Sequence, residues 1–146
     1  MPLELWHNVR MAHAVSTHLH PDQPVPNFDL RAIEAGLPLS AIEEFAAYSC
    51  IPVKDFLDAV IPLRTLKHRR ERKETLNIDE SDRLARIARL YELTVRVFGN
   101  PDKARHWLTR PKERFDGRTP LAMMRSGAGG RAVEEILYQI DEGVFA

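Results

Sequence analysis

Hydrophobic residues from Phe28 onward recur three or four positions apart, with no alternating pattern of the kind that predicts strands. The clearest repeat is one apolar stripe along a helix, formed by Leu84, Ile87, Ala88, Tyr91, Val95 and Phe98. Asn77 and Glu80 have capping-box spacing before this stripe, and Gly99 follows it as a stop. The pattern therefore predicts one long amphipathic helix between these caps.

Prolines mark the starts of shorter helices, because the first helical position has no use for the N–H that proline lacks. Pro52 and Pro62 are each expected to begin a helix. Asn100-Pro101 and Thr119-Pro120 each join a capping side chain to such a proline. Two short helices are thus predicted before the long helix and two after it.

Two more helices are expected, one near each end of the helical part. Ser40 has Glu43 three residues further on, which predicts a helix that begins with a capping box. The glycine-rich stretch 127–130 is expected to form a flexible turn ahead of the last helix, which Gly143 ends. The last helix is expected to bury Val133, Ile136, Leu137 and Ile140.

These elements predict an all-α fold in three parts. Residues 1–27 are broken by prolines near their end and are expected to be an N-terminal arm or linker. Residues 28–98 are expected to form a helix-turn-helix region for DNA binding or dimerisation. Residues 99–146 are expected to form a small helical C-terminal domain.

The positive charge of the chain is concentrated in one segment, although 21 basic and 21 acidic residues balance overall. Residues 61–75 hold six basic and two acidic side chains. This segment covers the second of two short helices, 52–60 and 62–73, which a tight corner at Ile61 separates. Two helices of this size predict a helix-turn-helix unit.

The second of these helices carries candidate DNA-binding residues. With Leu63 and Leu66 packed inward, it is expected to expose Arg64, Thr65, Lys67, His68, Glu71 and Arg72. Arginine, lysine and threonine near the start of such a helix are residue types that read base edges or hold phosphates. The alternative, a solvated basic helix face without a partner, stays open.

Catalytic, metal-binding and membrane functions find no support in the sequence. No acid, base and nucleophile cluster together, so the chain is not expected to be an enzyme or to hold a cofactor. The four histidines of the first 27 residues lack helical metal-ligand spacing, so no metal is expected. The single cysteine, Cys50, excludes an internal disulfide and fits the cytoplasm. No apolar run approaches the roughly 18 residues that span a membrane.

Several short motifs follow one another from Phe28 to the end of the chain. They are Gly36-Leu37-Pro38, Arg64-Thr65-Leu66 with Arg69, Glu80-Ser81-Asp82-Arg83-Leu84, Phe98-Gly99-Asn100, Trp107-Leu108, Pro111, Pro120-Leu121 and Gly143-Val144-Phe145. In this order and spacing they resemble the Xre/MbcA/ParS-type antitoxin family, the partners of RES-domain toxins. His68 departs from the family pattern, because it stands where another arginine is expected.

The resemblance implies an Xre-like helix-turn-helix region that binds operator DNA of its own operon and represses transcription. It adds Arg69 to the expected DNA-binding residues. Operator binding needs two reading helices about 34–36 Å apart, so a homodimer or higher assembly is expected.

The resemblance also implies a C-terminal domain that binds and neutralises a RES-domain toxin, while the antitoxin has no activity itself. Such toxins consume NAD, either by degrading it or by ADP-ribosylation. The C-terminal end is expected to obstruct the active site of the toxin. The expected toxin-binding residues are Arg131, Glu135, Tyr138, Gln139, Glu142, Gly143, Val144 and Phe145. The alternative is a stand-alone transcription regulator whose C-terminal domain only dimerises.

Overall fold

The computed structural model describes residues 28–143, which form helices and contain no strand. The elements are α2 (Leu30–Ala35), α3 (Ser40–Ser49), α4 (Val53–Val60), α5 (Leu63–Glu71), α6 (Ile78–Phe98), α7 (Pro101–Thr109), the 3-10 turn η1 (Glu113–Phe115), α8 (Pro120–Met123) and α9 (Gly127–Asp141). The predicted all-α fold is confirmed.

The long helix α6 is the central element, and its predicted ends are confirmed. The Asn77 side chain accepts from the Glu80 backbone N–H at 2.8 Å, and the Glu80 carboxylate accepts from the Asn77 N–H at 2.8 Å. Gly99 ends the helix in the left-handed conformation, with φ 66°. Since α6 has 21 residues at about 1.5 Å each, it spans roughly 30 Å.

Aromatic side chains hold α3 and α4 against α6. The Phe45 ring centroid lies 5.1 Å from that of Phe56 and 5.9 Å from that of Tyr91, both with edge-on geometry. Tyr48 packs edge-on against Tyr91 and donates its hydroxyl hydrogen bond to Glu92. These rings fill the core under the first half of the described chain.

The C-terminal helices α7 and α9 also pack against α6, and two of the predicted caps are confirmed. Asn100 accepts from the Lys103 N–H at 3.1 Å at the start of α7. Thr119 accepts from the Ala122 N–H at 3.0 Å at the start of α8. Val133 and Leu137 of α9 are fully buried in the shared core.

The flexible turn predicted for the glycine-rich stretch is wrong. Gly127–Gly130 is the first turn of α9, and Ser126 caps it by accepting from the Gly129 N–H at 3.0 Å. A Cβ at Gly129 would lie 1.8 Å from the Met123 carbonyl oxygen. Glycine is present because the backbone of α9 touches the end of α8, and only a residue without a side chain fits there.

Three predicted helix starts also differ from the structure. Ser40 is the first residue of α3 and forms no cap, because Leu39 occupies the capping position; the Glu43 carboxylate contacts Arg70 at 3.1 Å. Pro52 and Pro62 each occupy the capping position, one residue before the helix begins. Both prolines are therefore the last extended residue before a helix and do not belong to its first turn.

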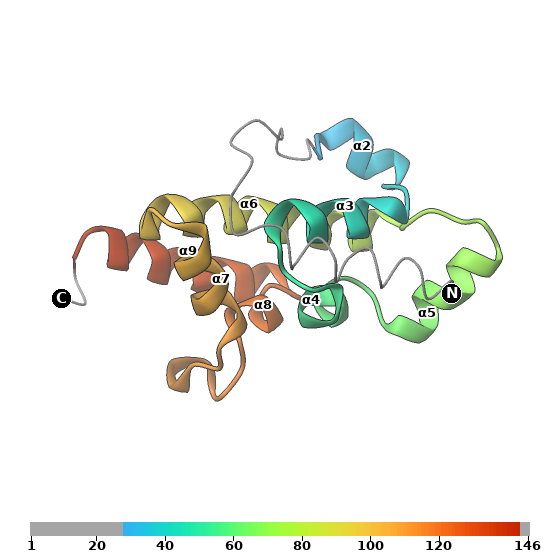
Figure 1. Cartoon of the computed structure of the whole chain (residues 1–146). Coiled ribbons are helices and arrows are strands. Elements are labelled where there is room, and N and C mark those ends of the chain that lie inside the picture. Colours follow the sequence, from blue (N-terminus) through green and yellow to red (C-terminus); the bar gives the residue numbers. More distant parts are fainter. Residues whose placement is uncertain (1–27, 144–146) are drawn as a thin grey trace.

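Two ends of the molecule are clearly separated along α6. Figure 1 shows α5 projecting at one end of the fold, while the C-terminal end of α9 lies at the opposite end. The basic helix α5 and the C-terminal end of α9 therefore lie on separate parts of the molecular surface.

Candidate DNA-reading helix and C-terminal groove

Helices α4 and α5 form the predicted helix-turn-helix unit. The corner between them is Ile61-Pro62, both extended, and Ile61 is fully buried. The Ile61 N–H continues the helix ladder by donating to the Leu57 carbonyl at 2.8 Å. The buried isoleucine takes the place of the glycine often found at such corners and fixes the start of α5 against the core.

The exposed face of α5 is basic along its N-terminal half. Arg64, Lys67 and His68 are exposed, and with the half-buried Thr65 and the exposed Glu71 they line a shallow surface groove. Four of the six predicted DNA-binding residues, namely Arg64, Thr65, Lys67 and His68, thus lie together on one face.

The other residues of α5 differ from expectation or take other positions. Leu63 was expected inward but is 41% exposed, because α5 turns only the Leu66 side to the core. Arg69 lies on the inner side and contacts Glu80 at 2.5 Å, and its side chain is only 18% exposed. Arg72 follows the helix as its C-cap and is 64% exposed.

The outer face of α9 carries most of the predicted toxin-binding residues. Arg131, Glu135, Tyr138 and Glu142 are exposed along one side, and Gln139 is half-buried beside them. Tyr138 is one of the few large hydrophobic side chains of residues 28–143 that is exposed, at 49%. Gly143 follows the helix with φ 75°, whereas Val144 and Phe145 lie outside the described residues.

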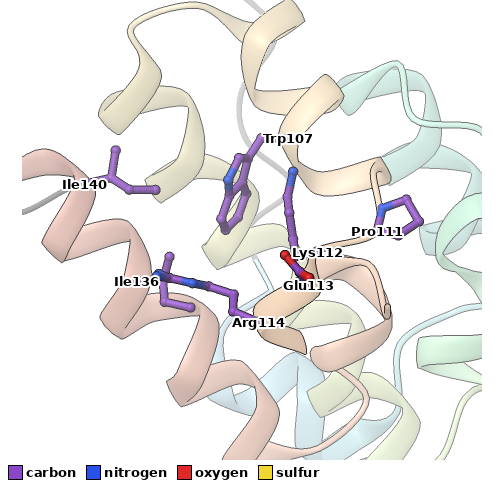
Figure 2. Close-up of a pocket in the computed structure, with 7 residues that line it drawn as sticks. All are labelled: Trp107, Pro111, Lys112, Glu113, Arg114, Ile136 and Ile140. Atoms are coloured by element: carbon purple, nitrogen blue, oxygen red, sulfur yellow. The ribbon is translucent and has the colours of Figure 1, made fainter. Parts of the chain in front are cut away.

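A second surface feature lies on the neighbouring side of α9. Ile136 and Ile140, which were expected to be buried, point instead into an open groove toward Trp107 of α7 (Figure 2). They differ from the prediction because Val133 and Leu137 alone occupy the core-facing line of the helix. The periodicity of the sequence does not separate the centre of a buried stripe from its edge.

Residues 111–114 form the other wall of this C-terminal groove. The Lys112 amine lies 5.3 Å from the centre of the Trp107 ring, in cation–π geometry. Burial, with a smaller contribution from the neighbouring Arg110, lowers the pKa of Lys112. Trp107 also packs on Phe98 at 5.8 Å, so the tryptophan is half-buried and belongs both to the groove and to the edge of the core.

Residues 28–143 contain no cluster of three or more potential metal ligands. The Ser49 hydroxyl is buried, donates to the Phe45 carbonyl at 2.8 Å and accepts from the Ile51 N–H at 3.2 Å. No helix in this part of the chain is long and apolar enough to cross a membrane.

Comparison with known proteins agrees with this division of the surface. Residues 29–89 match the family described as the antitoxin Xre-like helix-turn-helix domain. Residues 94–143 match the antitoxin Xre/MbcA/ParS C-terminal toxin-binding domain. The first region contains the α4–α5 unit, and the second contains the outer face of α9 and the groove at Trp107.

Three similar proteins are each named antitoxin Xre. The one from Pseudomonas putida is 52% identical over 86 residues, which are 59% of this chain and 54% of that protein. Those from Yersinia enterocolitica and Photorhabdus laumondii are each 28% identical, over 79% and 97% of this chain and 79% and 90% of their own lengths. The first match therefore spans about half of the curated relative.

A helix-turn-helix region followed by a toxin-binding domain is the domain order of Xre-type antitoxins of toxin–antitoxin systems. The chain belongs to the Xre/MbcA/ParS antitoxin family.

Proposed function

We propose that this chain neutralises a RES-domain, NAD-consuming toxin and represses its own operon. The observation that supports both activities is the presence of the two matched regions on one chain, 29–89 and 94–143. The exposed basic face of α5 and the end of α9 lie at opposite ends of α6 (Figure 1), so DNA and toxin do not compete for the same surface. In this proposal the chain acts by binding, without catalysing a reaction, and works in the cytoplasm beside its DNA and its toxin.

For the toxin, we assign the contact to the outer face of α9. Its exposed residues combine an aromatic ring, Tyr138, with the charged side chains of Arg131, Glu135 and Glu142. Tyrosine and arginine dominate the energetics of many protein interfaces, because they bury large areas and still satisfy their polar groups. The C-terminal end beyond Gly143 is proposed to obstruct the active site of the toxin sterically.

Deletion of residues 143–146 tests this obstruction. The last fully buried residue of α9 is Leu137, so the deletion removes no core side chain among the described residues. Neutralisation of the toxin in growing cells is expected to weaken more than the thermal stability of the antitoxin. A truncated chain that still rescues cells expressing the toxin would refute the obstruction.

Two point variants distinguish the outer face of α9 from the C-terminal groove. Tyr138→Ala removes the exposed ring of the outer face, and Lys112→Ala removes a cation of the groove. Co-purification with the toxin is expected to fall for Tyr138→Ala and to stay unchanged for Lys112→Ala. The reverse result would move the toxin contact to the groove.

For DNA, we assign the contact to the exposed basic face of α5. Double substitution of Arg64 and Lys67 by alanine is expected to abolish retention of the operon's promoter in a gel shift, while toxin co-purification stays intact. Because a symmetric operator needs two reading helices, mass measurement of the free chain is expected to give a homodimer or larger assembly. If the double variant still retained the promoter, the assignment of DNA contact to this face of α5 would be wrong.

The stand-alone regulator remains the competing hypothesis for the C-terminal part. It predicts that no adjacent open reading frame encodes a toxin and that nothing co-purifies through residues 94–143. The match of this region to a toxin-binding domain favours the antitoxin. Co-expression with the neighbouring gene, followed by mass measurement of the complex, decides between them.

A further inference from the structure

We propose that Arg69 is a positioning residue, which orients α5 for DNA through the buried carboxylate of Glu80 and does not itself contact DNA. This inference rests on the DNA binding proposed above. It differs from the role that the family pattern gives to Arg69, which is that of a DNA-binding residue.

The Arg69 guanidinium makes three contacts within the protein, through its Nη1 and Nε. Its Nη1 donates to a Glu80 carboxylate oxygen at 2.5 Å and to the Thr75 carbonyl at 3.0 Å, and its Nε lies 3.4 Å from the Glu74 carboxylate. All three partners belong to the connection between α5 and α6 or to the start of α6. Of these contacts, the one with the buried Glu80 ties the end of the reading helix to the beginning of the central helix.

Glu80 makes this connection rigid because one of its oxygens serves two elements. The same Oε1 that accepts from Arg69 also accepts from the Asn77 N–H at 2.8 Å, as part of the capping box of α6. The Glu80 side chain is only 6% exposed. A buried carboxylate that loses its cation is strongly destabilised, so Arg69 cannot leave for a phosphate without a large penalty.

Helix α5 needs such an anchor because it has little core of its own. Leu66 is its only fully buried side chain. One apolar contact holds a helix against a surface but does not fix its rotation about its own axis. Arg70 adds a second anchor to a different helix, since it contacts Glu43 of α3 at 3.1 Å.

The two anchors divide the basic residues of α5 by position. Arg69 and Arg70 hold the C-terminal half of the helix from α6 and α3, respectively. Arg64 and Lys67, nearer the N-terminus, are exposed and have no charged partner in the described structure within ion-pair distance. The N-terminal half is the half that enters a major groove in helix-turn-helix proteins.

Glu80→Gln separates positioning from direct contact, because the two roles predict opposite signs. Glutamine keeps an acceptor for the capping box but removes the charge that holds Arg69. If Arg69 positions α5, promoter affinity falls. If Arg69 contacts phosphate, the released guanidinium keeps or raises promoter affinity.

The measurement is the Kd of the full chain for a fluorescent duplex of its operon's promoter, by anisotropy at fixed salt. We expect Arg69→Ala and Glu80→Gln each to raise the Kd about tenfold, the result of cutting the population of the correctly oriented helix to a tenth. The double variant is expected to be no weaker than either single variant, because both act on one contact. Arg69→Lys, which keeps the charge but not the planar fork, is expected to recover part of the loss.

Glu74→Gln is the matched control. It removes an equal charge beside Arg69, but from a carboxylate that is 45% exposed, so promoter affinity is expected to stay near that of the unaltered chain. Toxin co-purification and circular dichroism monitor the fold. If Arg69→Ala does not fold, the promoter Kd values of Glu80→Gln and Arg69→Lys are compared instead.

Three outcomes overturn the proposal. The first is a Glu80→Gln chain that binds promoter as well as Glu74→Gln while Arg69→Ala binds weakly, which makes Arg69 a direct DNA contact. The second is unchanged affinity in both Arg69→Ala and Glu80→Gln. The third is an unaltered chain that does not bind the promoter, which removes the DNA function itself and is thereby distinguished from the first two.

Discussion

Substitution of Gly129 by alanine tests the close contact between α8 and α9. An added Cβ would lie 1.8 Å from the carbonyl oxygen and 2.8 Å from the carbonyl carbon of Met123. Both atoms belong to the backbone, so no side-chain rotation relieves the clash. The two helices must separate, and α9 must shift relative to the core.

The expected destabilisation follows from two opposing effects. Forced overpacking of this kind costs about 1–3 kcal/mol. Replacing glycine by alanine inside a helix returns up to about 1 kcal/mol. The overpacking term dominates, because movement of α9 also loosens Val133 and Leu137, which are fully buried. Each 1 kcal/mol lowers the melting temperature of a chain of this size by about 2–4 °C.

Thermal unfolding followed by circular dichroism measures the effect, with Gly127→Ala as the matched control in the same helical turn. A Cβ at Gly127 would meet nothing closer than 3.6 Å, the distance to the Arg131 side chain, so this variant is expected to melt at or above the temperature of the unaltered chain. Gly129→Ala is expected to melt lower and to bind toxin more weakly, because α9 carries the proposed contact face. A Gly129→Ala chain as stable as Gly127→Ala would refute the close approach.

Three further predictions concern stability. Asn77→Ala removes the cap of α6 and is expected to lower the free energy of unfolding in urea by about 1 kcal/mol, with Asn77→Ser close to the unaltered chain. Burial, together with the hydrogen bond and charge of Glu92, raises the pKa of Tyr48, and burial raises that of Tyr91. The unfolded chain therefore releases these protons first, so the stability measured by urea unfolding is expected to fall as pH rises above about 10, and less steeply in Tyr48→Phe. Arg86→Ala removes a hydrogen bond of 3.0 Å to the carbonyl at the end of α8 and is expected to lower the unfolding free energy by about 1.5 kcal/mol in the same assay, whereas an unchanged value would contradict a role for this contact.

Local signals in the sequence predicted much of the fold. Asn77 with Glu80, Asn100 before Pro101 and Thr119 before Pro120 each act within one helical turn, and the structure confirms all three. These signals succeed because a cap needs only the side chain and the nearest free backbone N–H groups.

Signals that depend on distant partners were misread. Glu43 has the spacing of a capping box with Ser40, yet a contact with Arg70, far along the chain, takes its carboxylate. Glycines predict turns, but Gly129 lies inside α9, where the nearby end of α8 leaves no room for a side chain. In both cases the sequence does not show where the contacting helix lies, which is α5 for Glu43 and α8 for Gly129.

The candidate site was predicted in its residue types more than in its geometry. The basic face of Arg64 and Lys67 follows from helical spacing, and the structure exposes both. The inward direction of Arg69 does not follow, because arginine is as suited to a buried carboxylate as to a phosphate. The groove beside Trp107 was also not predicted, since residues 107–114 on one wall and Ile136 and Ile140 on the other are more than twenty positions apart in the sequence.

The two family regions meet inside α6, since one ends at residue 89 and the other begins at 94, both within Ile78–Phe98. The junction is helical and contains no linker, so it offers a cellular protease no loop whose cleavage would separate the two halves. Cleavage there requires the central helix to unwind, which dismantles both halves at once. Under the proposed function, degradation of the chain would therefore free the promoter and the toxin in a single event.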